Sequence, residues 1–290
     1  MNLSVFLQNK LNVRVFASLP APFCYGYLQL LGRLYYLIRR RERRLIERNI
    51  RDMLHDRDER FVKQIVGQTF KGIFAHYFEK LFSAYRDLDQ IARYMKRRVS
   101  IRNAECLDDA MESGRGVILV TAHWGAVEFI PWVLGLSGYP VSVILECQTE
   151  QLETALEERA RFINAELISC SDNRSVFMRA VESLSRNRLL MTECDEVDTW
   201  HKRKHRTIDL FGRRIYLDNT LSILARKSGA TVVGVFLKRV SRFRYTLICE
   251  PIEAGMDTAV GAFTLWQKYV RLNPEQWYQW KKWRAMKVAS

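Results

Sequence analysis

The first hundred residues carry apolar side chains at a helical spacing. Over residues 61–82 they recur every three or four positions, and residues 45–53 show the same pattern. This period places apolar side chains along one face of a helix. We therefore predict a mainly helical N-terminal region.

From Val99 onward, short runs rich in β-branched residues alternate with helical segments. The runs cover residues 117–121, 141–145, 166–169, 189–192, 231–238 and 244–249. The first run is continuously apolar from Val117 to Val120, which is typical of a strand buried on both faces of a sheet. The alternation predicts an α/β fold in which helices flank a mostly parallel central sheet.

The change of pattern divides the chain into two regions. Residues 1–98 form a helical N-terminal cap, and residues 99–290 form an α/β domain. No internal repeat, low-complexity tract or linker rich in Pro, Gly and Ser lies between them. We expect the two regions to form a single compact unit.

The aromatic segment at residues 15–38 suggests contact with a membrane. Pro20, Pro22 and Arg33 interrupt it, so it is too broken to predict a spanning helix. Residues 39–44 follow directly and hold five arginines. Cations near anionic headgroups contribute about 1 kcal/mol each, so this order favours a membrane-associated anchor. The alternative is a soluble amphipathic helix with a solvated charged face.

The charge balance adds a second constraint on partners. The chain has 46 basic and 32 acidic residues, for a net charge of +14. This implies an anionic partner such as nucleic acid, an anionic membrane or an acidic protein. The sequence shows no helix-turn-helix, RNA-binding or zinc-finger pattern, which argues against nucleic acid. The six cysteines are scattered singly, as reduced core residues are, so we expect no metal and no cofactor.

A histidine and a carboxylate follow the buried strand. His123 lies just past the strand's end, and Glu128 begins an apolar helical segment five residues later. Gly125 is small enough for a substrate to approach the backbone. A carboxylate that fixes the imidazole leaves the other ring nitrogen to take a proton, so the pair predicts a general-base site. The alternative for His123 is a capping or core histidine beside a solvated glutamate. A different histidine, His76, lies in an apolar and aromatic region and is expected to be packed and hydrogen-bonded.

Several blocks, in order, resemble the bacterial lipid A late acyltransferases of the lysophospholipid acyltransferase superfamily. They are RRRERRLIERNI, VTAHWGAVE, ARFINAELI, LLMTECDE, IDLFGRR, LSILARKSGATVVGVFLKR and NPEQWYQWKKWR. They span most of the chain. Ala126 and Val127 stand where that family usually has asparagine and tryptophan, and Asp195-Glu196 replaces its Asp-Gln.

The resemblance implies transfer of a fatty acyl chain from an acyl carrier protein thioester to a hydroxyl of a lipid A precursor or related anionic glycolipid. It implies a mechanism without a covalent acyl-enzyme. It also implies that the protein lies at the cytoplasmic face of the inner membrane. His123 would be the base and Glu128 its orienting partner. Arg159 or Arg161 resembles the family's site arginine, which could hold the oxyanion or a lipid phosphate. Asp195 resembles its second acid.

Two basic segments are expected at the mouth of the His123 pocket by the same resemblance. Their cations are Lys202, Arg203, Lys204, Arg206, Arg213 and Arg214. They are the candidate surface for donor or headgroup binding. The sequence lacks a nucleotide-binding fingerprint, which favours an acidic carrier protein over acyl-CoA as donor. For residues 211–214 a solvated hairpin is the alternative.

Other functions stay open at this point. One is a lysophospholipid or glycerolipid acyltransferase, which differs in its acceptor. Another is a basic protein that binds a membrane or nucleic acid and catalyses no reaction. A binding protein has no need of a histidine and a glutamate at the end of a buried strand. A hydrolase is disfavoured because the sequence has no GxSxG nucleophile motif. Acyl transfer is therefore the leading hypothesis.

Overall fold

The computed structural model describes most of the chain. The described residues are 7, 9–147, 149–170, 175–200, 206–253 and 255–288.

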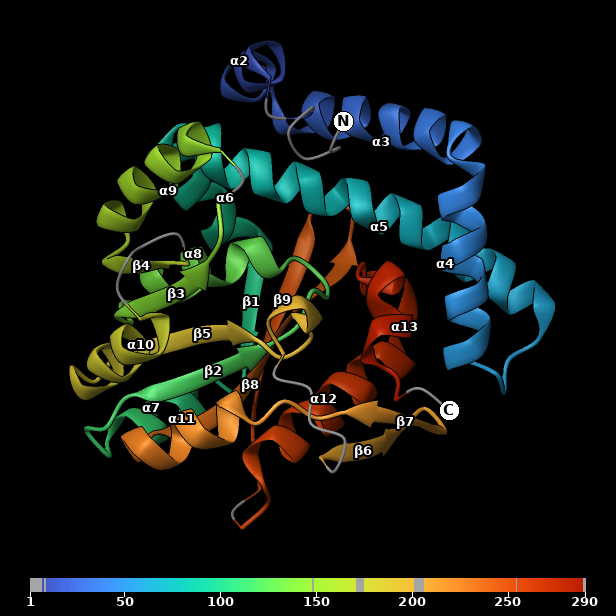
Figure 1. Ribbon diagram of the computed structural model, residues 1–290. Coiled ribbons are helices and arrows are strands. Elements are labelled where there is room, and N and C mark those ends of the chain that lie inside the picture. Colours follow the sequence, from blue (N-terminus) through green and yellow to red (C-terminus); the bar gives the residue numbers. More distant parts are fainter. Residues whose placement is uncertain are drawn as a thin grey trace.

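Helices make up the N-terminal region, as the spacing predicts. They are α2 (Lys10–Ser18), α3 (Ala21–Ile38), α4 (Arg40–Met53), α5 (Glu59–Tyr85) and α6 (Leu88–Arg98). Asp58 begins α5 by accepting a 2.7 Å hydrogen bond from the backbone N–H of Phe61, which satisfies a donor left free at the helix start. The long helix α5 packs against both α3 and α4 (Figure 1), and α4 also contacts the C-terminal segment directly.

The prolines of the aromatic segment begin a helix rather than interrupt one. Pro20 is the N-cap residue of α3 and Pro22 lies in the first turn, where a missing N–H costs no intrahelical hydrogen bond. A Cβ on Gly32 would lie 2.8 Å from the Phe74 ring, so α3 packs closely on α5. Among the described residues, no helix has the length and hydrophobicity required to cross a bilayer.

The described strands form a sheet of seven in the order β1-β9-β8-β2-β5-β3-β4. Only β8 and β9 pair antiparallel among them, and the other neighbouring strands are parallel. Their bounds are β1 Val99–Arg102, β2 Val117–Thr121, β3 Val141–Leu145, β4 Ala165–Ser169, β5 Leu189–Glu193, β8 Thr231–Ser241 and β9 Arg244–Pro251. All six runs predicted as strands are strands of this sheet, and β1 is the strand of the sheet that the sequence did not predict. The α/β fold class is confirmed.

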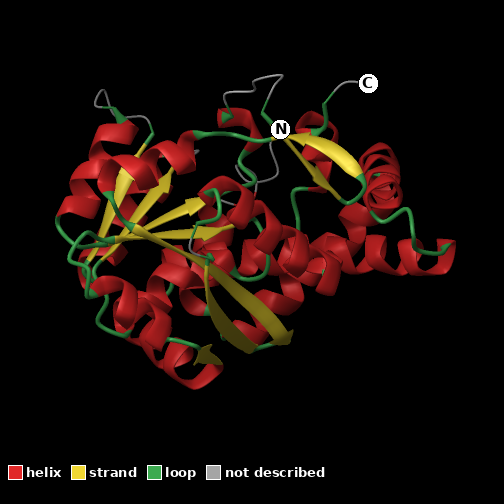
Figure 2. Ribbon diagram, turned by 90° about the horizontal axis from the view of Figure 1, so that it is seen from below, coloured by secondary structure: helices red, strands yellow, loops and turns green. Residues whose placement is uncertain are grey.

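Helices cover both faces of the sheet (Figure 2). Val117 and Leu119 of β2 point into one core cluster, whereas Ile118 and Val120 point into another. All four side chains are fully buried, which explains why this strand is continuously apolar. The remaining helices are α7 (Glu105–Met111), α8 (Ile130–Leu136), α9 (Glu150–Phe162), α10 (Val176–Ser185), α11 (Thr220–Ser228), α12 (Thr258–Leu272) and α13 (Trp283–Met286), with short turns η1 (Val127–Phe129), η2 (Val197–Thr199), η3 (Pro274–Gln276) and η4 (Trp280–Lys282).

Strands β6 (Thr207–Leu210) and β7 (Arg213–Tyr216) form a separate antiparallel hairpin. Its turn is Phe211-Gly212, so residues 211–214 do lie in the hairpin proposed as the plainer alternative. The hairpin packs beside α12 and the C-terminal helices.

The strand order decides which loops meet. β2 lies between β5 and β8, and it is parallel to both. The carboxyl ends of β2 and β5 therefore meet at the same edge of the sheet, the usual place for a site in such folds. His123 follows β2 and Asp195 follows β5, so the topology brings together two residues that are 72 positions apart.

Candidate active site

His123 is held by Asp195. The Nδ1 atom of His123 lies 2.9 Å from Oδ1 of Asp195, and the backbone N–H of His123 donates to both oxygens of that carboxylate at 3.0 and 3.1 Å. Asp195 is 1% exposed. A buried carboxylate at Nδ1 fixes both the orientation and the tautomer of the imidazole, leaving Nε2 as the nitrogen that can exchange a proton.

The C-terminal segment completes this pair. The indole N–H of Trp277 donates a 2.7 Å hydrogen bond to Oδ2 of Asp195. The backbone N–H of Tyr278 donates to the carbonyl of His123 at 3.1 Å, and Trp124 pairs with Trp277 as in an antiparallel bridge. The Pro274-Glu275-Gln276-Trp277 motif therefore supports the site, a role that the sequence left unassigned.

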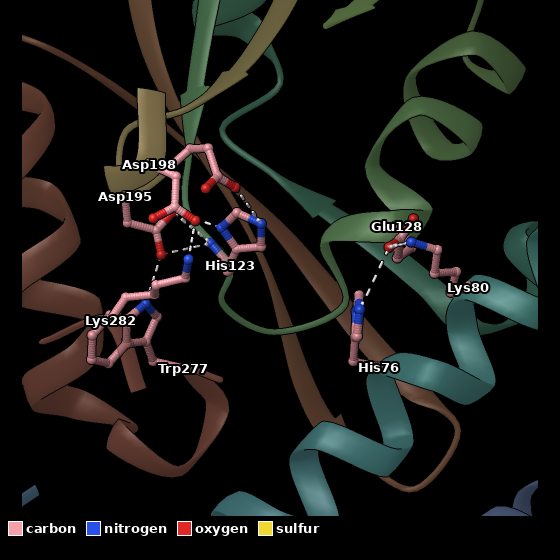
Figure 3. Close-up of polar contacts among 9 residues, drawn as sticks. His76, Lys80, His123, Glu128, Asp195, Asp198, Trp277 and Lys282 are labelled. Carbon is pink, nitrogen blue, oxygen red and sulfur yellow. Dashed lines mark hydrogen bonds and ion pairs between the residues drawn. The ribbon is translucent and has the colours of Figure 1, made fainter. Parts of the chain in front are cut away.

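Glu128 does not take the predicted place beside His123. Its carboxylate lies 3.6 Å from Nε2 of His76 and 4.0 Å from Nζ of Lys80, both on α5. Figure 3 shows this group at one end of the loop from β2 to η1 and the His123–Asp195 pair at the other. His123 and Glu128 are joined by this loop, which carries their side chains to opposite sides. The carboxylate hydrogen-bonded to Nδ1 of His123 is that of Asp195.

His76 lies within the site region, not in a separate core. Its ring stacks on Tyr278 with centroids 4.2 Å apart, and the same Tyr278 meets the His123 ring edge-on at 5.6 Å. Burial lowers the pKa of His76 well below its usual value, so this imidazole is neutral at pH 7. The expected packing of His76 is confirmed by this stack. The expected hydrogen bond is not found, because the Nδ1 atom is buried without a hydrogen-bond partner.

Carboxylates control the charge of His123. Burial alone would lower the pKa of His123, but the charge and hydrogen bond of Asp195, with the nearby charges of Glu193 and Glu196, raise it to about 10. Burial also raises the pKa of Glu193, to about 7, although the His123 cation opposes this. Oε2 of Glu196 lies 3.5 Å from Nε2 of His123. The resting imidazole is therefore protonated at neutral pH.

The loop after His123 is rigidly braced. Gly125 has a φ of 64°, and a Cβ there would lie 2.0 Å from the carbonyl oxygen of Leu237. Its N–H donates to the carbonyl of Gln276 at 3.0 Å, and its carbonyl accepts from the guanidinium of Arg239. The opening that the sequence predicted for a substrate beside Gly125 is filled by β8.

Arg239 is the centre of that bracing. Its guanidinium donates to both oxygens of Glu79 on α5 at 2.7 and 2.8 Å, and Glu79 is 1% exposed. The side-chain amide of Gln276 bonds both backbone groups of Arg239, at 2.9 and 3.1 Å. The arrangement ties α5, β8 and the C-terminal segment to the loop that carries His123. No local sequence pattern marks Glu79 and Arg239, because the partners of this ion pair are 160 positions apart.

The structure separates the two candidate arginines of α9. Arg161 is exposed, whereas the side chain of Arg159 is only 12% exposed and lines a groove of about 590 Å³ with Tyr85. Arg159 pairs with Glu158 and donates to the carbonyl of Arg86 at 3.3 Å. Neither arginine forms a hydrogen bond or ion pair with His123 in the described chain. Their role at the oxyanion stays a prediction.

The predicted basic surface is partly neutralised. Lys202, Arg203 and Lys204 lie outside the described residues. The other three cations each contact a carboxylate: Arg206 with Asp257 at 2.8 Å, Arg213 with Asp52 at 3.0 Å and Arg214 with Asp209 at 3.5 Å. Pairing of this kind reduces the charge that these arginines can offer to an anionic partner.

The site as a whole is suited to general-base chemistry on a hydroxyl. It offers one imidazole fixed by a buried carboxylate and a second, neutral imidazole beside a loosely held glutamate. Within the described ranges, no group of three or more His, Cys, Asp or Glu side chains is arranged to hold a metal ion.

Comparison with known proteins agrees with this chemistry. The model of the family described as "Bacterial lipid A biosynthesis acyltransferase" matches residues 6–284. No curated protein matches the chain at a significant level.

Proposed function

The chain belongs to the bacterial lipid A biosynthesis acyltransferase family and is an acyltransferase, and we propose that it transfers a fatty acyl chain from acyl carrier protein to a hydroxyl of a lipid A precursor. The match covers nearly the whole chain, including the His123 loop and the C-terminal segment. A lipid A-like acceptor follows from the family. The donor and the roles of single residues are our proposal.

One observation carries the mechanism: Asp195 holds Nδ1 of His123 at 2.9 Å while it also receives the indole N–H of Trp277. In this proposal Asp195, not Glu128, orients the base. A carboxylate fixed by several donors cannot swing away from the imidazole, so Nε2 is held in one direction. A general base at a fixed distance typically contributes about 100- to 10,000-fold to the rate.

The reaction needs few protein groups because a thioester is already activated. Nε2 of His123 takes the proton of the acceptor hydroxyl as its oxygen attacks the thioester carbonyl carbon. The tetrahedral intermediate then collapses, the C–S bond breaks, and the leaving thiolate receives the proton from His123. One ester forms and one thiol leaves, with no acyl-enzyme.

The charge of His123 sets a condition on this mechanism. With a pKa of about 10, most of the resting enzyme carries a protonated imidazole. The active form is the neutral minority, or a form produced when substrate binding changes the charge of Glu193 or Glu196 beside the ring. The imidazolium that forms during attack is correspondingly well stabilised by those carboxylates, which favours the transition state.

The location and the donor complete the proposal. The exposed apolar side chains of α3, at Phe23, Leu30, Leu34, Leu37 and Ile38, support a membrane-lying face. The arginines of residues 39–44 continue it, and both features suit the cytoplasmic face of the inner membrane. The net charge of +14 supports an acidic carrier protein as donor. A lysophospholipid acceptor is the alternative that the assay must exclude.

The test is a transfer assay with the purified protein. Acyl carrier protein and acyl-CoA carrying the same chain are each offered with a lipid A precursor, a lysophospholipid and glycerol 3-phosphate. We expect transfer from the carrier protein to the lipid A precursor, and loss of that transfer in His123→Ala with the fold intact. Wild-type rates in His123→Ala, or turnover with acyl-CoA equal to that with the carrier protein, would contradict the proposal.

A further inference from the structure

A second polar group lies beside the catalytic pair and takes no part in the mechanism above. It consists of His76 and Lys80, one turn apart on α5, and Glu128 on η1 (Figure 3). Only one ring separates it from the base, because Tyr278 stacks on His76 and meets His123 with its edge. The two groups therefore belong to one site.

The Glu128 carboxylate is loosely held. Its neighbours lie at 3.6 Å and 4.0 Å, longer than the 2.7 to 3.2 Å of a normal hydrogen bond. No hydrogen bond to this carboxylate is present in the part of the chain that the structure describes. Its side chain is 24% exposed and that of Lys80 is 21% exposed. Both side chains are therefore partly accessible to a ligand.

A purely structural role fits these distances poorly. An ion pair that fastens one element to another is short and saturated, as Glu79 and Arg239 show nearby at 2.7 and 2.8 Å. The neutral His76 cannot form an ion pair, and it leaves Nδ1 without a partner. Burying Nδ1 of His76 without a partner costs free energy, so this group adds little to the stability of the fold.

Given the proposed function, on which this inference rests, we propose that Lys80, Glu128 and His76 form the subsite that holds the polar headgroup of the acceptor. Lys80 donates to a phosphate oxygen of the glycolipid, and Glu128 accepts from a neighbouring sugar hydroxyl. His76 and Tyr278 form the wall between this subsite and His123. The subsite selects a phosphorylated sugar headgroup and so places the acceptor's free hydroxyl at Nε2 of the base.

The chemistry distinguishes this acceptor from others. An ammonium and a carboxylate side by side match a sugar phosphate, which offers an anion and several hydroxyl donors close together. A lysophospholipid also has a phosphate but carries fewer hydroxyls near it, so it would use Lys80 and leave Glu128 unpaired. An unpaired carboxylate disfavours binding, which makes the glutamate a source of discrimination.

The test uses binding as well as turnover. Four variants are compared: Lys80→Met, Glu128→Gln, His76→Phe, which keeps the stack on Tyr278, and Lys63→Met, a matched control exposed on the same helix. We expect Lys80→Met and Glu128→Gln to raise the acceptor KM about 10- to 100-fold, the loss typical of one charge-assisted hydrogen bond, with the donor KM unchanged. His76→Phe keeps the wall and removes no charged contact to the acceptor, so its acceptor KM should stay near that of the wild type. Lys63→Met should match the wild type.

Binding of the headgroup alone is measured in a His123→Ala background, by calorimetry. The probes are a glucosamine disaccharide monophosphate, the same disaccharide without phosphate, and inorganic phosphate. We expect Lys80→Met to weaken the phosphorylated sugar only, and Glu128→Gln to weaken both sugars. Because no turnover is needed, this arm still reports on the subsite if the proposed transfer reaction is not observed.

Three results would overturn the inference. In the first, Lys80→Met and Glu128→Gln bind the phosphorylated disaccharide as the wild type does. In the second, inorganic phosphate binds as tightly as the sugar phosphate, which would mean a simple anion site. In the third, kcat falls and the pH profile shifts with both acceptor KM and headgroup binding unchanged, which would mean that Glu128 acts on His123 and not on the acceptor. Thermal unfolding of each variant separates these results from loss of the fold.

Discussion

The indole N–H of Trp277 reaches Oδ2 of Asp195 at 2.7 Å, so a residue near the chain's end fixes the carboxylate that orients the catalytic histidine. Asp195 is nearly inaccessible to solvent and accepts its other hydrogen bonds from His123 itself. The bond to Trp277 is therefore the side-chain link between Asp195 and the C-terminal segment, and it can be removed without changing His123 or Asp195.

Trp277→Phe should lower kcat by about tenfold or more. Removing a hydrogen bond to a charged group costs about 1.5 to 3 kcal/mol, and 1.4 kcal/mol is a factor of ten. Trp283→Phe is the matched control, because its indole N–H donates at the same distance of 2.7 Å to Asp52, which takes no part in the proposed mechanism. Both variants should lose stability in urea unfolding. An equal loss of kcat in the two would assign the effect to folding alone.

Glu193→Gln should move the pH profile to lower pH. Glu193 is one of the carboxylates whose charge raises the pKa of His123 to about 10, so removing it lowers that pKa. The base must be neutral to act, so kcat/KM rises with pH up to the pKa of the free enzyme. A lower pKa of His123 therefore makes kcat/KM rise at lower pH. NMR titration of the His123 imidazole checks that its pKa has fallen. Asp198→Asn, exposed and paired with Lys282, is the control and should leave the profile unchanged.

Glu79→Gln should destabilise the fold strongly. Breaking a buried ion pair from one side leaves an uncompensated charge and costs about 3 to 5 kcal/mol. Glu79 is 1% exposed, and its partner Arg239 also holds the carbonyl of Gly125, so activity should fall as well. Lys268→Met breaks the pair with Glu250 at a side chain 51% exposed, where a loss of about 1 kcal/mol or less is expected. Equal changes in the free energy of unfolding would contradict the assignment of Arg239 as the brace.

Glutamate substitutions on α3 should weaken binding to anionic vesicles. Leu34 and Leu37 are 48% and 62% exposed on the outer side of this helix, and burying them in lipid is the apolar part of the proposed membrane contact. Leu272→Glu, at a position 64% exposed on α12, is the control. Charge reversal in residues 39–44 should remove the salt-sensitive part of the binding. Vesicle flotation at low and high salt measures the apolar and the salt-sensitive parts of the binding. If the wild-type protein does not bind vesicles at low salt, the proposal that α3 contacts the membrane is contradicted.

Reversing Lys202, Arg203 and Lys204 together should raise the KM for acyl carrier protein and flatten its salt dependence, with kcat largely unchanged. Charges at the rim of an interface act mainly on association. Arg213→Glu should have a smaller effect on donor KM, because Arg213 is already paired with Asp52. If these lysines and Arg203 serve the acceptor instead, its KM will rise and that of the donor will not.

The sequence by itself determined the order and type of most elements. The continuous apolar run at β2 and the period of three to four in α5 reflect which side chains must leave water, and that requirement is local. The same local reasoning located His123 at a strand end and the arginines after the aromatic segment. The family resemblance rested on short blocks with fixed residue types, and the family match over residues 6–284 confirms it.

Only the tertiary structure decided which side chains meet. A sequence spacing of five suggested Glu128 as the partner of His123, but the parallel pairing of β2 with β5 brings Asp195 there instead. The bracing of Gly125 by Arg239 depends on the pairing of β8 with β2 and on a C-terminal segment that folds back to hold the Arg239 backbone. These contacts join residues more than 70 positions apart. Their geometry follows from strand order and packing, which no local pattern of residues encodes.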